Sequence, residues 1–180
     1  MKTKTTVCII VALFLYVGTP SAANWATSQG SCYGQWSKNV SFGMSLLHFG
    51  FFGAFDLGIH DCISVGFASG YNGYGHNRYW RYNYVPIAFR GAFHPFNLQV
   101  IADKIRVRDK LDVYVGLASG GRVGWAKWEG SGDELAEPDV GGFFIREYIG
   151  IRFFPKDFFY LVAEEGSGLG TLNLGVGFKF

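Results

Sequence analysis

The sequence predicts an all-β fold, a transmembrane antiparallel up-and-down β-barrel of eight strands. Large apolar residues alternate with small or polar residues at a period of two in one segment after another. Aromatic residues make up 18% of the chain and there are 26 glycines, which suits a wall with an apolar outer face and a crowded inner face. A soluble β-sandwich is the alternative, but it would need a very large core to bury these aromatic residues.

The alternation is clearest over residues 171–180, where one face carries Leu172, Leu174, Val176, Phe178 and Phe180. Seven earlier segments repeat the pattern: 40–46, 51–59, 63–69, 85–93, 111–119, 143–154 and 160–165. Eight is an even number and the smallest size of a bacterial single-chain barrel. With a periplasmic start, we expect external loops near residues 48–51, 71–79, 120–141 and 166–170. We expect periplasmic turns near residues 60–62, 94–110 and 155–158.

Three regions are predicted along the chain. Residues 1–23 are typical of a signal peptide, because Lys2 and Lys4 precede an apolar run that is followed by small residues up to Ala23. A retained anchor is the weaker alternative, since the run is shorter than the roughly 20 residues of a membrane-spanning helix. Residues 24–38 are then a periplasmic segment and residues 39–180 the barrel.

Charge and motifs exclude several classes of function. Without Lys2 and Lys4, 14 basic residues face 14 acidic ones, so the chain lacks the basic surface of a nucleic-acid-binding protein. No glycine-rich phosphate loop follows a strand and opens a helix. We therefore expect no nucleic-acid partner and no cofactor.

The same alternation points charged side chains into the lumen. Buried charges are costly unless they are paired, and the interior of an eight-stranded barrel is just filled by side chains. We therefore predict a salt-bridged network that fills the lumen, with an ion path as the alternative. Its predicted members are Arg90, Asp112, Arg146, Arg152 and Glu164.

No catalytic or metal site is predicted. A lipid hydrolase would pair a histidine with a serine and an acid, but no histidine stands two residues before a serine, and the histidines lack metal-site spacing. We read all four as turn or interface side chains: His48, His60, His76 and His94. Cys32 and Cys62 would remain after signal cleavage, and a disulfide between them is possible but is not established by sequence.

Two segments at the predicted external end have more than one interpretation. The aromatic cluster at residues 71–82 suits a girdle at the membrane interface, with a binding surface as the alternative. The acidic residues of 120–141 lack the ordered spacing of a calcium loop, so a solvated loop is expected.

Several stretches resemble the small eight-stranded outer-membrane β-barrel family, the opacity-protein and OmpX-like group in its Bacteroidota-type version. They include residues 63–66, 84–94, 111–117, 148–154 and 172–180, and the resemblance covers roughly residues 40–180. It departs from the family at residues 95–110, where the turn is longer. The resemblance implies that Leu172, Leu174, Val176, Phe178 and Phe180 form the signal read by the barrel-assembly machinery.

The resemblance implies a location in the bacterial outer membrane and a structural or surface-interaction role, in adhesion or envelope integrity. The expected partners are outer-membrane lipid, the assembly machinery and an external ligand that the sequence does not identify. A lipid-modifying hydrolase and a small channel are the alternatives. The first would need a catalytic set that the sequence does not reveal, and the second a wider lumen, so we expect no enzyme.

Overall fold

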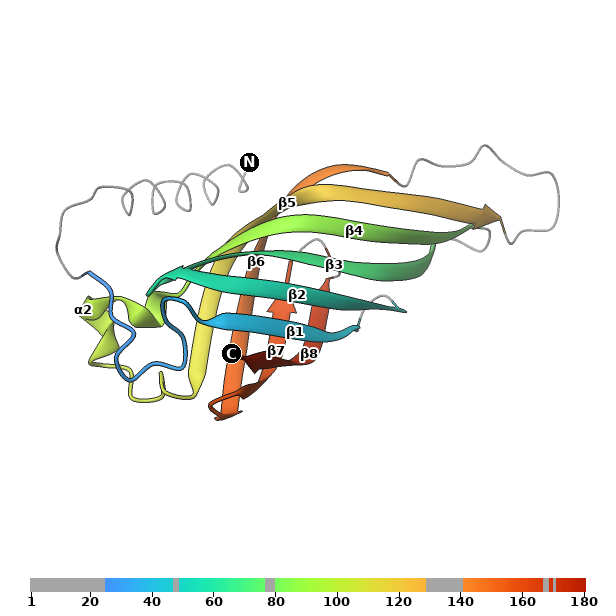
Figure 1. Cartoon of the computed structure of the whole chain (residues 1–180). Coiled ribbons are helices and arrows are strands. Elements are labelled where there is room, and N and C mark those ends of the chain that lie inside the picture. The colour runs from blue at the N-terminus through green and yellow to red at the C-terminus, as the bar shows by residue number, and fades with distance from the viewer. Residues whose placement is uncertain (1–24, 47–48, 77–79, 129–140, 167–168, 170) are drawn as a thin grey trace.

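The computed structural model describes residues 25–46, 49–76, 80–128, 141–166, 169 and 171–180. Eight antiparallel strands follow one another around a closed barrel in sequence order (Figure 1). They are β1 (Lys38–Ser45), β2 (Phe49–His60), β3 (Ile63–His76), β4 (Trp80–Phe93), β5 (Leu111–Trp128), β6 (Gly142–Lys156), β7 (Phe159–Glu165) and β8 (Leu172–Lys179). The predicted fold class is confirmed. The predicted signal peptide and most of the acidic loop lie outside the described residues.

The strands extend further than the alternation indicated. Residues 71–76 and 120–128, predicted as external loops, belong to β3 and β5. The ladder between β4 and β5 runs without interruption from Phe93↔Val115 to Trp80↔Trp128. Glycine and asparagine in these stretches suggest loops. Cross-strand aromatic pairs nevertheless favour continued strand pairing, as with Trp80 and Trp128, whose ring centres lie 5.1 Å apart.

As a result the barrel has walls of unequal height. β3, β4, β5 and β6 have 14 to 18 residues, whereas β1, β7 and β8 have only seven or eight. Barrels of this architecture keep short turns on the periplasmic side, which assigns the end with the 61–62 and 157–158 turns to the periplasm. The tall wall therefore rises at the external end.

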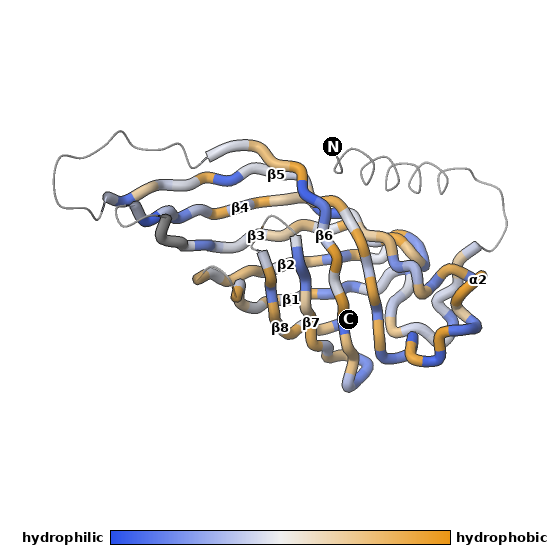
Figure 2. The backbone as a smooth tube through the Cα atoms, turned by 180° about the vertical axis from the view of Figure 1, so that it is seen from behind, coloured by the Kyte–Doolittle hydropathy of each residue, from blue (hydrophilic) through white to orange (hydrophobic). Residues whose placement is uncertain are grey.

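Apolar side chains cover the outside of the barrel. Residues on the outward face of neighbouring strands are exposed, among them Phe42, Phe67, Ile87, Phe89 and Leu161. Figure 2 shows apolar residues recurring along the strands. Such a surface is stable in hydrocarbon and unfavourable in water. Among the described residues, the helices are all too short to cross a bilayer.

The N-terminal segment closes the periplasmic end. Residues 25–37 lie against the connection between β4 and β5 (Figure 1), which contains η1 (Pro95–Asn97) and α2 (Gln99–Ala102). Ala26 forms an isolated bridge with Leu98, and the amide of Cys32 donates to the carbonyl of Arg108 at 2.8 Å. The side chain of Asn97 donates to the carbonyl of Tyr33 at 3.0 Å. The long connection between β4 and β5 thus provides the backbone and side-chain groups that bind this segment.

Tyrosine rings inside the barrel lie over glycines of the neighbouring strand. The three cross-strand pairs are Tyr114 with Gly150, Tyr148 with Gly116 and Tyr160 with Gly177. A methyl group added at Gly150 would lie 2.2 Å from Cζ of Tyr114. Pairing a ring with a glycine fills a narrow lumen without overcrowding it.

The first prediction follows from these pairs. Gly150→Ala is expected to destabilise the folded barrel by about 1–3 kcal/mol, because the Tyr114 ring must move. Unfolding in denaturant, from liposomes or detergent, measures the change. Gly121→Ala is the matched control, since a methyl group added there would lie 4.0 Å from the Gly142 carbonyl oxygen, an ordinary van der Waals contact. A Gly150→Ala barrel as stable as the control would contradict the crowding argument.

Candidate functional site: the closed lumen

Buried charged side chains form one connected set of ion pairs in the lumen. Arg90 on β4 donates to both carboxylate oxygens of Glu164 on β7, at 2.6 and 3.1 Å. Asp56 on β2 lies 3.0 Å from Nε of Arg90 and 2.5 Å from Nη2 of Arg152. Arg152 on β6 lies 3.6 Å from Asp112 on β5. Asp56 therefore joins the two arginines.

Strand register brings these groups together. Gly66 pairs with Asp56 on one side and with Arg90 on the other. A Cβ at Gly66 would lie 2.7 Å from Oδ1 of Asp56, so the glycine leaves room for the ion pair. Asp112 pairs directly with Arg152 across β5 and β6. The period of two turns all five charged residues of the network to the same side of the wall.

Tyrosine rings pack against the arginines. The guanidinium of Arg90 lies 4.4 Å from the ring centre of Tyr148, and that of Arg152 lies 4.5 Å from the ring centre of Tyr114. The Tyr114 hydroxyl donates to Glu164 at 2.9 Å. Cation–π contacts of desolvated arginines are favourable, so the rings exclude water from the ion pairs and also stabilise them.

Arg146 is not part of this network, contrary to the sequence prediction. It lies on the lumen face of β6, paired in register with Ala118, but its side chain is exposed. It forms no ion pair with another residue in the described part of the chain. The reason is the unequal height of the walls: pairing between β6 and β7 ends at Ile149 and Glu165, so Arg146 lies above the closed lumen.

Asp56 was missed by the sequence reasoning, although the signal was present. Phe55 and Leu57 are apolar, so a period of two turns position 56 inward. The structure makes Asp56 the only described residue that pairs with both arginines. Its omission reflects the irregular pattern of that segment.

A serine, a histidine and an aspartate also meet at the periplasmic end of the lumen. Nε2 of His94 lies 3.0 Å from the hydroxyl of Ser64, and Nδ1 lies 2.7 Å from a carboxylate oxygen of Asp112. All three side chains are buried. The ring of Tyr33 stacks on His94, with 3.6 Å between ring centres and 7° between planes. The prediction that His94 is a turn or interface side chain overlooked this array, because its members are 30 and 18 positions apart.

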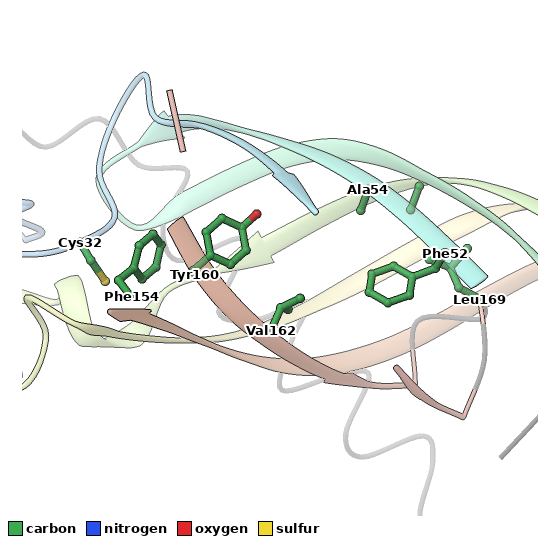
Figure 3. Close-up of a cluster of buried hydrophobic side chains, with 8 residues drawn as sticks. Cys32, Phe52, Ala54, Phe154, Tyr160, Val162 and Leu169 are labelled. Carbon is green, nitrogen blue, oxygen red and sulfur yellow. The ribbon is translucent and has the colours of Figure 1, made fainter. Parts of the chain in front are cut away.

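Cys32 and Cys62 are both free and do not form a disulfide with each other in this structure. Cys32 packs in a cluster with Phe154 and Tyr160 (Figure 3), whereas Cys62 lies in the β2–β3 turn with Sγ 3.5 Å from His60. They do not pair because each thiol packs into a different environment. Burial raises the pKa of each thiol to about 12. Little thiolate is then available for oxidation.

The external side of the lumen is closed by a separate contact. Leu169, between β7 and β8, is buried in the cluster that contains Phe52, Ala54 and Val162 (Figure 3). The side chain of Asn72 on β3 donates to the carbonyl of Leu169. The lumen is thus filled at three levels: by Leu169 outside, by the ion pairs in the middle and by the N-terminal segment at the periplasmic end. Among the described residues, no group of three side chains could hold a metal ion.

Comparison with known proteins identifies the architecture. No family model and no curated protein sequence matches the chain. The outer membrane protein OprG of Pseudomonas aeruginosa superposes with a TM-score of 0.56 at 8% identity, over 84% of this chain and 98% of OprG. The attachment invasion locus protein Ail of Yersinia pestis superposes with a TM-score of 0.52 at 13% identity, over 81% of this chain and 99% of Ail. The N-terminal β-barrel domain of Pseudomonas aeruginosa OprF gives a TM-score of 0.50 at 18% identity, over 82% and 99%.

These low identities show a shared fold and nothing finer. The chain is an eight-stranded barrel of the outer-membrane type. Its apolar outer face and closed sheet satisfy the two requirements of a chain that spans lipid with strands, which are an apolar surface and no unpaired backbone in hydrocarbon. The predicted location in the bacterial outer membrane agrees with this architecture.

The second prediction concerns Asp56. Asp56→Asn is expected to cost about 3–5 kcal/mol of folding stability, because it leaves buried arginines without their shared carboxylate. Glu164→Gln is expected to cost less, since Arg90 retains Asp56. Denaturant unfolding of the barrel measures both. Glu147→Gln is the control, because that side chain is exposed and its loss is expected to change stability by no more than about 0.5 kcal/mol. Equal stability of all three variants would contradict a network centred on Asp56.

Proposed function

We propose that this barrel has a surface-interaction role, carried by the tall wall at its external end. The supporting observation is an open sheet edge. β6 pairs with β7 only from Ile149 onward, and Gly166 approaches the backbone of Glu147 and Tyr148. Residues 142–146 therefore have β5 on one side and no described strand on the other. Backbone groups along such an edge can pair with an extended segment of another polypeptide.

Side chains along this edge favour the same interpretation. Phe143 and Ile145 are 74% and 61% exposed, and the exposed Arg146 and Glu147 follow them. Apolar and charged residues together on an open edge suit the addition of a partner strand, in which backbone hydrogen bonds give affinity and side chains give selectivity. The opacity-like and OmpX-like resemblance and the name of Ail, for attachment and invasion, agree with an adhesive role.

A structural role in the envelope is compatible with the same molecule, whereas the closed lumen disfavours a channel. A solute would have to pass Leu169, the buried ion pairs and the N-terminal segment. The barrel-assembly machinery and outer-membrane lipid remain proposed partners. The role of Phe180 in assembly is likewise a proposal. Phe180 is exposed, and its amide donates to the carbonyl of Lys38 at 2.9 Å.

The third prediction tests the open edge. Phe143→Lys combined with Ile145→Lys is expected to reduce adhesion of cells displaying the barrel to the level of cells that lack it, because edge lysines oppose strand addition. Adhesion to cultured host cells or extracellular matrix is measured. Val100→Lys, also 74% exposed but at the periplasmic end, is the matched control. Unchanged adhesion of the double variant would rule out the edge. If strains lacking the protein lose only detergent resistance, and both variants restore it, the role is structural.

A second candidate function rests on the Ser64–His94–Asp112 array, which has the hydrogen-bond pattern of a serine hydrolase. In such a reaction Ser64 Oγ would attack an ester carbonyl carbon, and His94 would take its proton and pass it to the leaving alcohol. Water would then release the acid. The stacked Tyr33 ring and the complete burial of the array oppose this function, which makes it the weaker candidate.

The fourth prediction separates a hydrolase from a structural array. As a structural array, Ser64 is expected not to react with a fluorophosphonate in the wild-type barrel or in Tyr33→Ala. Maleimide labelling of Cys32 and Cys62 reports whether Tyr33→Ala has opened the periplasmic end. Labelling of Tyr33→Ala by the fluorophosphonate, abolished by adding Ser64→Ala, would support the hydrolase. If maleimide shows that Tyr33→Ala is open and the fluorophosphonate still does not label it, the hydrolase is eliminated.

A further inference from the structure

The outer face of the barrel is hollowed where β6, β7 and β8 meet. The hollow has a volume of about 360 Å³ and is lined by Ile151, Phe153, Leu161, Val162, Ala163, Leu174 and Gly175. Four of these residues point outward yet are only 41–46% exposed: Ile151, Phe153, Leu161 and Leu174. Phe67, Ile87 and Phe89, on β3 and β4, are 56–79% exposed. The hollow makes this stretch of the lipid-facing surface concave.

Cross-strand register explains the hollow. Ile151, Ala163 and Leu174 lie in one row across the three strands, and the small central residue leaves a gap between two larger ones. The next row is Phe153, Leu161 and Val176. The hollow thus has large apolar residues at its sides and small ones, Ala163 and Gly175, at its floor.

A third row brings a positive charge to the periplasmic edge of the same face. After an irregularity beyond Phe153, Lys156 pairs with Phe159, and Phe159 pairs with Phe178. The rings of Phe159 and Phe178 lie 5.7 Å apart. Paired residues share a face of the sheet, so Lys156 belongs to the face that carries the hollow, and its side chain is exposed.

We propose that this hollow holds one acyl chain of an anionic phospholipid from the periplasmic leaflet, with the lipid phosphate at Lys156. The five residue steps from Ile151 to Lys156 span about 16 Å along the strand. One leaflet contributes half of the roughly 30 Å hydrocarbon core, so the hollow and the lysine are separated by about the length of one acyl chain. The apolar lining accepts the chain, and the ammonium group accepts the phosphate.

The experiment compares lipids retained by purified barrels. Wild type and variants are reconstituted in phosphatidylcholine vesicles containing phosphatidylglycerol, extracted in mild detergent and examined by native mass spectrometry. Wild type is expected to retain one phosphatidylglycerol. Ala163→Phe fills the gap and is expected to lose it. Gly53→Phe is the matched control, because this outward glycine lies on β2 and is exposed; it is expected to retain the lipid.

The charge is tested separately at the exposed rim, where a substitution leaves the fold intact. Lys156→Gln is expected to lower the preference for phosphatidylglycerol over phosphatidylcholine about fivefold, the contribution of one basic residue near an anionic surface. Asp157→Asn, the adjacent exposed residue, is expected not to lower it. Equal retention by wild type and Ala163→Phe, or no change of preference in Lys156→Gln, would overturn the proposal. A dimer that Ala163→Phe dissociates would assign the hollow to a second copy of the chain instead.

Discussion

The structure depends on the pairing of buried charges in a lumen filled by side chains. Asp56 is the centre of this pairing, because it is in contact with both Arg90 and Arg152. A buried carboxylate shared by two arginines ties β2 to β4 and to β6, which are not neighbours in the sheet. The barrel is thus held together across its interior as well as around its wall. Removing one partner leaves an unpaired charge, which is more costly than never burying the pair.

Filling the lumen in this way constrains what the barrel can do. The lumen is filled by tyrosines packed over glycines, by cation–π contacts and by the closures at its two ends. We therefore look for binding sites on the outer surface of the barrel. Two outer regions are distinctive: the open edge of β6 above the barrel and the hollow on β6, β7 and β8. The hollow arises from the small Ala163 between Ile151 and Leu174, whereas the open edge arises because β7 is much shorter than the strand before it. The short strand ends the pairing of β6 early.

At the periplasmic end, the long connection between β4 and β5 has a structural role. The connection between β4 and β5 is longer at residues 95–110 than the family resemblance implies, and its residues hold the N-terminal segment. His94 begins that turn and carries Tyr33 on its ring, while its two nitrogens are occupied by Ser64 and Asp112. We regard this array mainly as the structural anchor of the N-terminal segment that closes the periplasmic end, because Tyr33 and the surrounding chain bury it.

The strand count, the fold class and the outward face of most strands were predictable from the sequence, because a period of two in hydrophobicity is a local property of the chain. For the same reason four of the five predicted lumen charges point inward and are buried. Arg146 obeys the alternation too, but its burial depends on whether a neighbouring strand faces it, and β7 ends too early. The extension of β5 to Trp128 depends on aromatic pairing with β4. The Ser64–His94–Asp112 array and the free state of Cys32 and Cys62 depend on contacts between distant positions. Tertiary structure alone decided these features, since local pattern carries no information about which distant side chains meet.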